Sequence, residues 1–207
     1  MDLAARYEFR IWANSLEDPR TRLQLLAQSG GTQASKETYL VSSATDKCNM
    51  KIRNDLLDIK VLIAVNLGLE QWCPALKTSF PLEASVAASE IFPRLEVEAP
   101  HLSAPQFHMD QFLEEVARTV PSIAIVPVCK VRQRFTLGAC QAESSSVTIN
   151  NAVFETIAVE SPDPNAALAM VHQLGIDRAA NTSYVRQIKR LLNNHEARIN
   201  TRLAGSN

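Results

Sequence analysis

Cysteine is scarce in this sequence of 207 residues, and its four cysteines form no C-x-x-C pair. Thiols so few and so far apart cannot cross-link a chain of this size, so we expect them to be reduced, as in a cytoplasm. The four histidines show no metal-ligand spacing with one another. This spacing argues against a zinc site.

Long apolar runs are missing as well. No stretch of the sequence reaches the about 18 consecutive apolar residues that predict a membrane helix. Charged residues interrupt the segment from Met1 to Asn14, so it lacks the apolar core of a signal peptide. We therefore expect a cytoplasmic protein with no membrane partner.

A basic excess is also absent, because 21 Lys and Arg face 22 Asp and Glu and leave a formal net charge of -1. This balance argues against a general nucleic-acid binder. An anion site in this chain must therefore come from a local concentration of Lys and Arg. With 46% hydrophobic residues the chain is long enough to bury a core in one large domain or two small ones.

One local concentration of positive charge begins at Lys130 and continues with Arg132 and Arg134. Alternate side chains of a strand share a face, so all three would point to one side of a sheet. Such a row is often only a solvated sheet face. Lys51 and Arg53 form a weaker echo of the row in the first half of the chain.

Residue periodicity predicts a chain with more strands than helices. Strands are predicted over residues 6–13, 38–43, 49–54, 57–65, 123–135, 140–149 and 153–160. Helices are predicted over residues 15–29, 82–91, 106–120, 163–175 and 183–203. Leu23, Leu25 and Leu26 give the first helix an apolar side, and Gly30-Gly31 is expected to end it. Asp163-Pro164 and Gly175 are the expected start and end of the fourth, and Asn150-Asn151 is expected to form a hairpin turn. Prolines interrupt residues 69–120, which we interpret as a partly helical connector between two pseudo-symmetric halves, 1–68 and 121–207.

The order of these segments and their charged residues resembles the CYTH, or triphosphate tunnel metalloenzyme, superfamily over nearly the whole chain. The family's first strand reads E-x-E-x-K, and the corresponding segment here is Arg6-Tyr7-Glu8-Phe9-Arg10. Arg6 therefore replaces the first glutamate. The acidic cluster before the last helix, E-x-E in the family, is Ala158-Val159-Glu160 and lacks one carboxylate as well.

The basic strands carry the rest of the resemblance. Lys51 and Arg53 stand where the family has an R-x-R strand, and Asp58-Ile59-Lys60 resembles its T-x-K strand. The row that begins at Lys130 resembles the basic strand of the second half. Glu143 stands where that half supplies a carboxylate.

The resemblance implies an α+β fold of mostly antiparallel strands, with an eight-stranded tunnel and peripheral helices in a single domain over residues 1–207. It implies that Glu8, Glu143 and Glu160 are catalytic and bind Mg²⁺ or Mn²⁺. It also implies a set of phosphate-binding cations, which are Arg10, Lys51, Arg53, Lys60, Lys130, Arg132, Arg134 and Lys189.

The expected function is that of a divalent-metal-dependent hydrolase of inorganic triphosphate or an organic triphosphate. The expected partner is a triphosphate-containing small molecule or polyphosphate. An alternative is a non-catalytic polyphosphate- or nucleotide-binding protein, which the replacement at Arg6 favours. A class IV adenylate cyclase is a further alternative, although nothing in the sequence selects ATP. Glu155 faces away from Glu160 in a strand, so we expect it to be structural.

Overall fold

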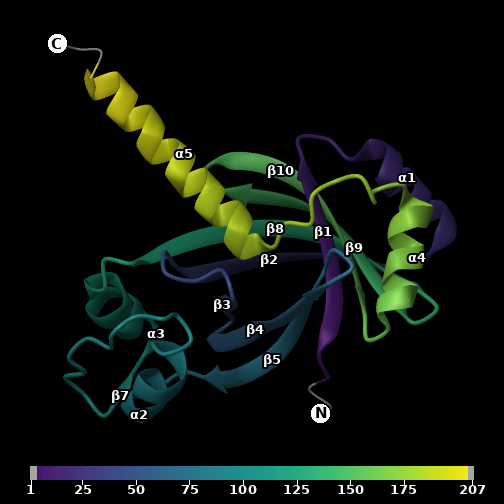
Figure 1. The fold of residues 1–207 in the computed structure, drawn as a ribbon. Coiled ribbons are helices and arrows are strands. Elements are labelled where there is room, and N and C mark those ends of the chain that lie inside the picture. The colour runs from purple at the N-terminus through teal and green to yellow at the C-terminus, as the bar shows by residue number, and fades with distance from the viewer. Residues whose placement is uncertain (1–3, 205–207) are drawn as a thin grey trace.

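Eight antiparallel strands form a closed barrel in the computed structural model, which describes residues 4–204 (Figure 1). Their order around the barrel is β1-β10-β9-β8-β2-β3-β4-β5. The strands are β1 Arg6–Ala13, β2 Gln28–Ser42, β3 Cys48–Arg53, β4 Leu56–Asn66, β5 Leu69–Ser79, β8 Ile123–Leu137, β9 Cys140–Ile149 and β10 Ala152–Ser161. This architecture confirms the predicted fold class.

One barrel strand was missed by the sequence interpretation. Residues 69–79, assigned to the connector, form β5 and pair with both β4 and β1. The prediction was wrong because Pro74 was interpreted as a breaker. Pro74 lies opposite Lys60 where the register between β4 and β5 shifts, and a proline is tolerated at such an irregularity. The first half of the barrel therefore extends to Ser79.

The glycine pair at Gly30 and Gly31 does not end the first helix. The helix α1 Glu17–Leu26 stops earlier, and the pair lies inside β2 at a register shift against β8. Gly31 has a φ of +87°, which a bulge can require and which side chains with a Cβ avoid. Only Leu23 of the predicted apolar side of α1 is buried, whereas Leu25 is 81% exposed.

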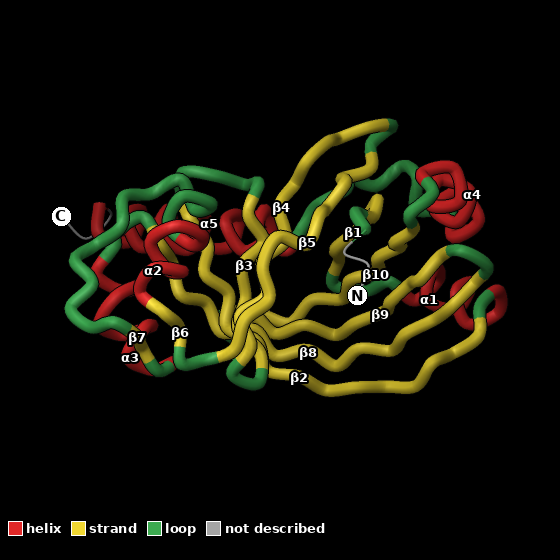
Figure 2. Tube along the Cα trace, turned by 90° about the horizontal axis from the view of Figure 1, so that it is seen from below, coloured by secondary structure: helices red, strands yellow, loops and turns green. Residues whose placement is uncertain are grey.

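Helices cover the barrel from two sides (Figure 2). On one side, α1 and α4 Pro164–Leu174 pack on the outward face of β1 and β10. On the opposite side, short elements between β5 and β8 cover β3 and β4. These are β6 Leu82–Glu83, α2 Ala84–Val86, η1 Ala87–Ile91, β7 Gln106–Phe107, α3 Met109–Gln111, η2 Phe112–Val116 and η3 Ala117–Thr119.

The predicted stop and turn signals of the second half are confirmed. Asp163 accepts a hydrogen bond from the N–H of Asn165 at the start of α4, and Gly175 ends the helix in the left-handed conformation. Asn150 and Asn151 both have positive φ and form the turn between β9 and β10. Within residues 4–204, no helix combines the length and the apolar character that crossing a membrane requires.

The side chains that point into the barrel change in character along its length. At one end they are apolar and pack against the start of α5 Tyr184–Ala204, whose far end projects from the barrel (Figure 1). This apolar cluster comprises Tyr39, Val41, Val126, Val128, Val147, Ile149, Tyr184, Val185 and Ile188. The next inward-facing position on two of these strands is charged. Glu37 lies two residues before Tyr39 on β2, and Lys130 lies two residues after Val128 on β8, and together they form an ionic layer.

Candidate functional site

A cavity of about 440 Å³ lies beyond this ionic layer, inside the barrel. Five of the predicted phosphate-binding cations line it from β3, β4 and β8, and these are Lys51, Arg53, Lys60, Arg132 and Arg134. The carboxylates in its lining are Asp58, Glu143 and Glu160. Five cations against three carboxylates make the cavity locally positive in a chain whose formal net charge is -1.

The other three predicted cations lie elsewhere. Arg10 and Lys130 are almost completely buried next to the cavity, where both stack on the ring of Tyr184 at 4.7 and 4.5 Å from its centroid. Lys189 is not brought to the cavity. Its Nζ binds Asp46 at 2.6 Å and the carbonyl oxygen of Thr45 at 2.8 Å, so it holds the loop between β2 and β3 to α5.

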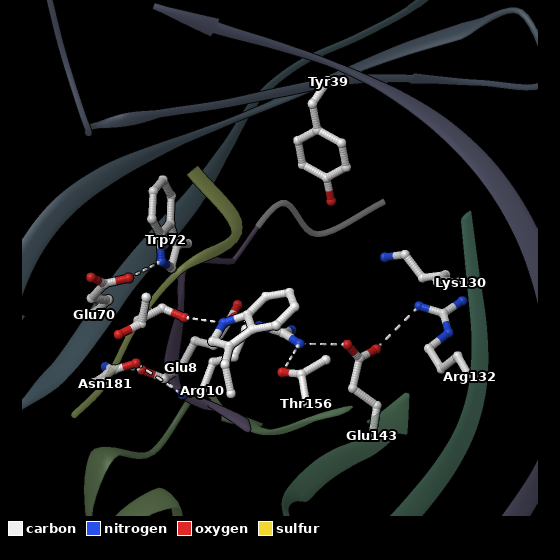
Figure 3. A network of polar contacts seen from close by, with 12 residues as sticks. Glu8, Arg10, Tyr39, Glu70, Trp72, Lys130, Arg132, Glu143, Thr156 and Asn181 are labelled. Atoms are coloured by element: carbon white, nitrogen blue, oxygen red, sulfur yellow. Dashed lines mark hydrogen bonds and ion pairs between the residues drawn. The ribbon is translucent and has the colours of Figure 1, made fainter. Parts of the chain in front are cut away.

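Glu143 lies between two arginines (Figure 3). Its Oε1 accepts a hydrogen bond from Nη1 of Arg10 at 2.9 Å, and its Oε2 accepts one from Nη1 of Arg132 at 3.3 Å. Burial opposes ionisation of this carboxyl. Arg10, Lys130 and Arg132 outweigh that effect and hold the pKa of Glu143 well below its usual range. Glu143 is therefore a permanent counter-ion of the basic residues.

Glu8 and Glu160 stand directly opposite each other on the neighbouring strands β1 and β10. Glu8 accepts a hydrogen bond from Nε of Arg10 at 2.8 Å. Burial and the adjacent Glu8 raise the pKa of Glu160, and Lys60 opposes them. Of these two facing carboxylates, Glu160 lines the basic cavity and Glu8 does not, and Arg10 and Lys60 only partly balance their negative charge.

Glu37 is a site residue that sequence reasoning missed. Its side chain is completely buried and contacts Lys130 at 3.1 Å, Arg53 at 3.3 Å and Lys51 at 3.6 Å. The predicted strand began at Thr38, one residue too late to include it, whereas β2 spans residues 28–42. Alternate residues of a strand share a face, so a strand predicted to begin before Thr38 would have placed Glu37 on the same face as Tyr39.

Glu70 was missed for a related reason, because it belongs to the strand that was interpreted as connector. It lies opposite Glu8, accepts a hydrogen bond from Nε1 of Trp72 at 3.1 Å and pairs with Arg186 of α5 at 2.7 Å (Figure 3). Trp72 is buried at 3% exposure. It therefore anchors this side of the barrel and is not accessible for stacking on a nucleobase.

Glu155 has the structural role expected for it. Its carboxylate accepts hydrogen bonds from the N–H of Leu16 at 2.6 Å and from Arg20 at 2.7 Å, on the side of β10 that carries α1. Burial opposes ionisation, but these two donors together lower the pKa of Glu155.

The positions of Glu8, Glu143 and Glu160 show whether a divalent cation could bind between them. Within the part of the chain that the structure describes, no cluster of three or more His, Cys, Asp or Glu is arranged to hold a metal. Mg²⁺ commonly binds one or two protein carboxylates and completes its coordination with substrate phosphates and water. Facing Glu8 and Glu160 offer such oxygen donors, whereas both oxygens of Glu143 are held by arginines. The pair thus provides oxygen donors of the type that a hard divalent ion takes, and one of them, Oε1 of Glu8, also accepts from Nε of Arg10.

Comparison with solved structures identifies the fold. PH1012 of Pyrococcus horikoshii OT3 is similar over 88% of this chain and 97% of its own, with 13% identity and a TM-score of 0.52. A candidate adenylate cyclase of Bacillus halodurans is similar over 89% and 98%, with 10% identity and a TM-score of 0.51. PH1819 of Pyrococcus horikoshii OT3 is similar over 89% and 98%, with 12% identity and a TM-score of 0.50.

No protein-family model and no curated protein sequence matches the chain. At 10–13% identity the structural matches establish the fold alone. Together with the closed barrel, they confirm the triphosphate-tunnel fold of CYTH-type proteins that the sequence resemblance predicted.

Proposed function

We propose that this protein binds a triphosphate, either inorganic or as part of a small organic molecule, in the barrel cavity and hydrolyses it with a divalent cation. The observation that carries the proposal is the convergence of five cations from three strands on one cavity. Buried cations repel one another and lose hydration, a cost that a polyanion offsets through charge-assisted hydrogen bonds. Arginine adds bidentate geometry to such bonds.

The residues in and next to the cavity would have different roles in binding and hydrolysis. Arg132, Arg134 and Arg53 would hold phosphate oxygens, and Lys51 and Lys60 would supply point charges. Glu8 and Glu160 would hold Mg²⁺ or Mn²⁺ at the edge of the cavity. When bound, such an ion bridges carboxylate and phosphate oxygens and neutralises charge that develops during phosphoryl transfer.

A specific observation favours a second candidate function, a non-catalytic polyphosphate- or nucleotide-binding protein. The carboxylates of Glu8 and Glu143 are both held by Arg10, and Arg6 and Ala158 stand where the family pattern has glutamates. A site with so few free carboxylates can bind an anion without positioning a metal.

Metal removal separates the two functions. We expect phosphate release from tripolyphosphate in the presence of Mg²⁺ or Mn²⁺, and we expect EDTA to abolish it. Calorimetry of tripolyphosphate binding in EDTA provides the second measurement. Binding without release under any metal condition would support the non-catalytic function, and the absence of both binding and release would reject both. Cyclic nucleotide formation from ATP in the same assay would support the cyclase alternative.

Arg134 offers a test of anion binding that leaves the fold intact. It is exposed and makes no ion pair with any residue that the structure describes, although it lines the cavity. We expect Arg134→Ala to weaken tripolyphosphate binding about 10- to 150-fold, since one charge-assisted hydrogen bond is worth roughly 1.5–3 kcal/mol. The melting temperature should not change.

Arg118→Ala is the matched control, because Arg118 is exposed on η3 outside the barrel and pairs only with its neighbour Glu114 among the described residues. Equal binding by wild type and Arg134→Ala would exclude this residue from the anion site.

A further inference from the structure

Next to the cavity, one buried carboxylate is shared by three cations, two of which line the cavity. Both Lys130 and Lys51 contact Oε2 of Glu37, at 3.1 and 3.6 Å, and Arg53 contacts Oε1 at 3.3 Å. The hydroxyl of Tyr39 also donates to Oε2, at 3.2 Å. The side chains of Glu37 and Lys130 are almost completely buried, so solvent screens their contact little, whereas those of Lys51 and Arg53 are 18% and 30% exposed.

Lys51 and Arg53 are the members of this cluster that also line the cavity, and Lys51 is the one of the two that can lose its proton. The charged groups around it are Glu37 of β2, Lys130 of β8, and Asp58 and Lys60 of β4. Burial and the charge of Lys130 lower the pKa of Lys51 to about 8, even though Glu37 and Asp58 act in the opposite direction. Lys51 is thus close to losing its proton near neutral pH.

Lys130 has a similar environment. It faces Glu143 of β9, Arg10 of β1 and the Tyr184 ring of α5 in addition to Glu37. Burial lowers the pKa of Lys130, while Glu143 and Glu37 oppose this effect. Two ammonium groups therefore contact one carboxylate oxygen, and the side chain of Lys130 is only 3% exposed.

We propose that Glu37 is a positioning residue that keeps Lys51 protonated while the cavity holds no anion. The inference rests on the proposed function, because it concerns the readiness of that same site for a polyanion. Without the carboxylate, Lys51 and Lys130 would be buried like charges, and a buried lysine in that position releases its proton. A neutral Lys51 would have to take up a proton when the anion binds.

The test is the pH dependence of tripolyphosphate binding, measured by calorimetry in EDTA between pH 6 and about 9. Wild-type affinity should weaken as the pH rises through about 8. In Glu37→Gln, which keeps the shape of the side chain, the weakening should begin at a lower pH. At pH 7.5 we expect an affinity about 10-fold below wild type, since one charge-assisted bond is lost. At pH 6 the affinity should be at least that of wild type.

If the affinity of Glu37→Gln recovers at pH 6, the weakening at pH 7.5 is caused by loss of a proton. A structural defect would persist at the lower pH. Glu114→Gln is the matched control, because it removes the same charge from an exposed position on η2 and should keep the wild-type profile. Glu37→Gln combined with Lys51→Arg should regain affinity at pH 7.5, since guanidinium does not lose its proton. An unchanged profile in Glu37→Gln would overturn the proposal.

A measurement without any anion decides the role of Glu37 independently of the proposed function. The Cε resonance of Lys51, assigned by its loss in Lys51→Arg, reports the pKa of this lysine in each protein. We expect a pKa of about 8 in wild type and a lower one in Glu37→Gln. Equal values would overturn the inference even if tripolyphosphate binds, and a lower value would support it even if tripolyphosphate does not.

Should Glu37→Gln fail to fold, Lys51→Arg alone remains decisive. It retains Glu37 and replaces the titrating ammonium by a group that stays charged. The weakening of binding near pH 8 should disappear in this variant. A pH step that persists would show that Lys51 is not the titrating group and would overturn the proposal.

Discussion

Replacing Arg10 by methionine should lower the free energy of unfolding at pH 7 by about 3–5 kcal/mol, the usual cost of breaking a buried ion pair. The Arg10 side chain is only 4% exposed and binds Glu8 at 2.8 Å and Glu143 at 2.9 Å. Its Nη1 also donates to Thr156 at 3.3 Å. Methionine fills a similar volume but leaves two carboxylates inside the barrel without their main counter-ion.

The loss of unfolding free energy in Arg10→Met should be smaller at low pH than at neutral pH. In wild type the pKa of Glu143 lies below its unfolded value, so this carboxylate stabilises the fold above about pH 4.5 and the contribution is lost as the pH falls. Without Arg10 the pKa of Glu143 rises, and protonation relieves its burial. Urea unfolding should therefore show a smaller difference between the proteins at pH 4 than at pH 7.

Arg20→Met is the control for this prediction, because Arg20 also pairs with a glutamate but is 35% exposed. Such an ion pair contributes about 0–1 kcal/mol. If Arg10→Met costs no more than Arg20→Met, Arg10 is not the main counter-ion of the buried carboxylates Glu8 and Glu143.

Replacing Glu160 by glutamine should remove hydrolysis of tripolyphosphate while making the protein more stable. Loss of one of the two carboxylates proposed to hold the metal should lower the rate by more than about 10²-fold, because even residues that only orient metal ligands account for about 10–100-fold. Burial and Glu8 raise the pKa of Glu160, so its ionised form destabilises the fold at neutral pH. Neutral glutamine relieves this repulsion.

The stability gain of Glu160→Gln should be largest at neutral pH. It should vanish as the pH falls below about 4.5, the unfolded value, because wild-type Glu160 is then protonated as well. Thermal unfolding at both pH values, together with phosphate release, measures the two effects. A variant that is less stable at pH 7, or one that keeps wild-type activity, would contradict the assignment of Glu160.

Glu155→Gln is a comparison variant on the same strand, and we expect it to change stability in the opposite direction from Glu160→Gln. The pKa of Glu155 is lowered by its contacts to Leu16 and Arg20, so removing its charge should reduce stability at neutral pH. Its carboxylate lies on the outer side of β10, so activity should be kept. Opposite shifts in the two variants would link stability to the environment of each carboxylate.

The sequence was informative wherever a physical signal is local. Alternation placed Lys130, Arg132 and Arg134 on the inner face of one strand, two of them in the cavity lining and the third just behind it. The Asp163 cap and the Asn150 turn depend only on their immediate neighbours, and both were predicted. The resemblance of the charged strands was sufficient to predict the closed barrel.

Where a residue's partners come from distant segments, the sequence was insufficient. Lys189 was grouped with the phosphate-binding cations because it carries the right charge, but α5 holds it against Asp46 and the adjacent loop. Pro74 concealed β5, and with it Glu70, because the register shift that accommodates a proline is formed by the neighbouring strand.

The sequence by itself therefore determined which residues share a strand face and that positive charge is concentrated in two segments. Only the tertiary structure decided how these charges are paired. Pairing of β2 with β3 on one side and β8 on the other brings Glu37 within 3.1–3.6 Å of cations from both neighbours. Because the strength of an ionic interaction depends on distance and burial, and both are set by segments far apart in the chain, the ionic layer could not be derived from local pattern.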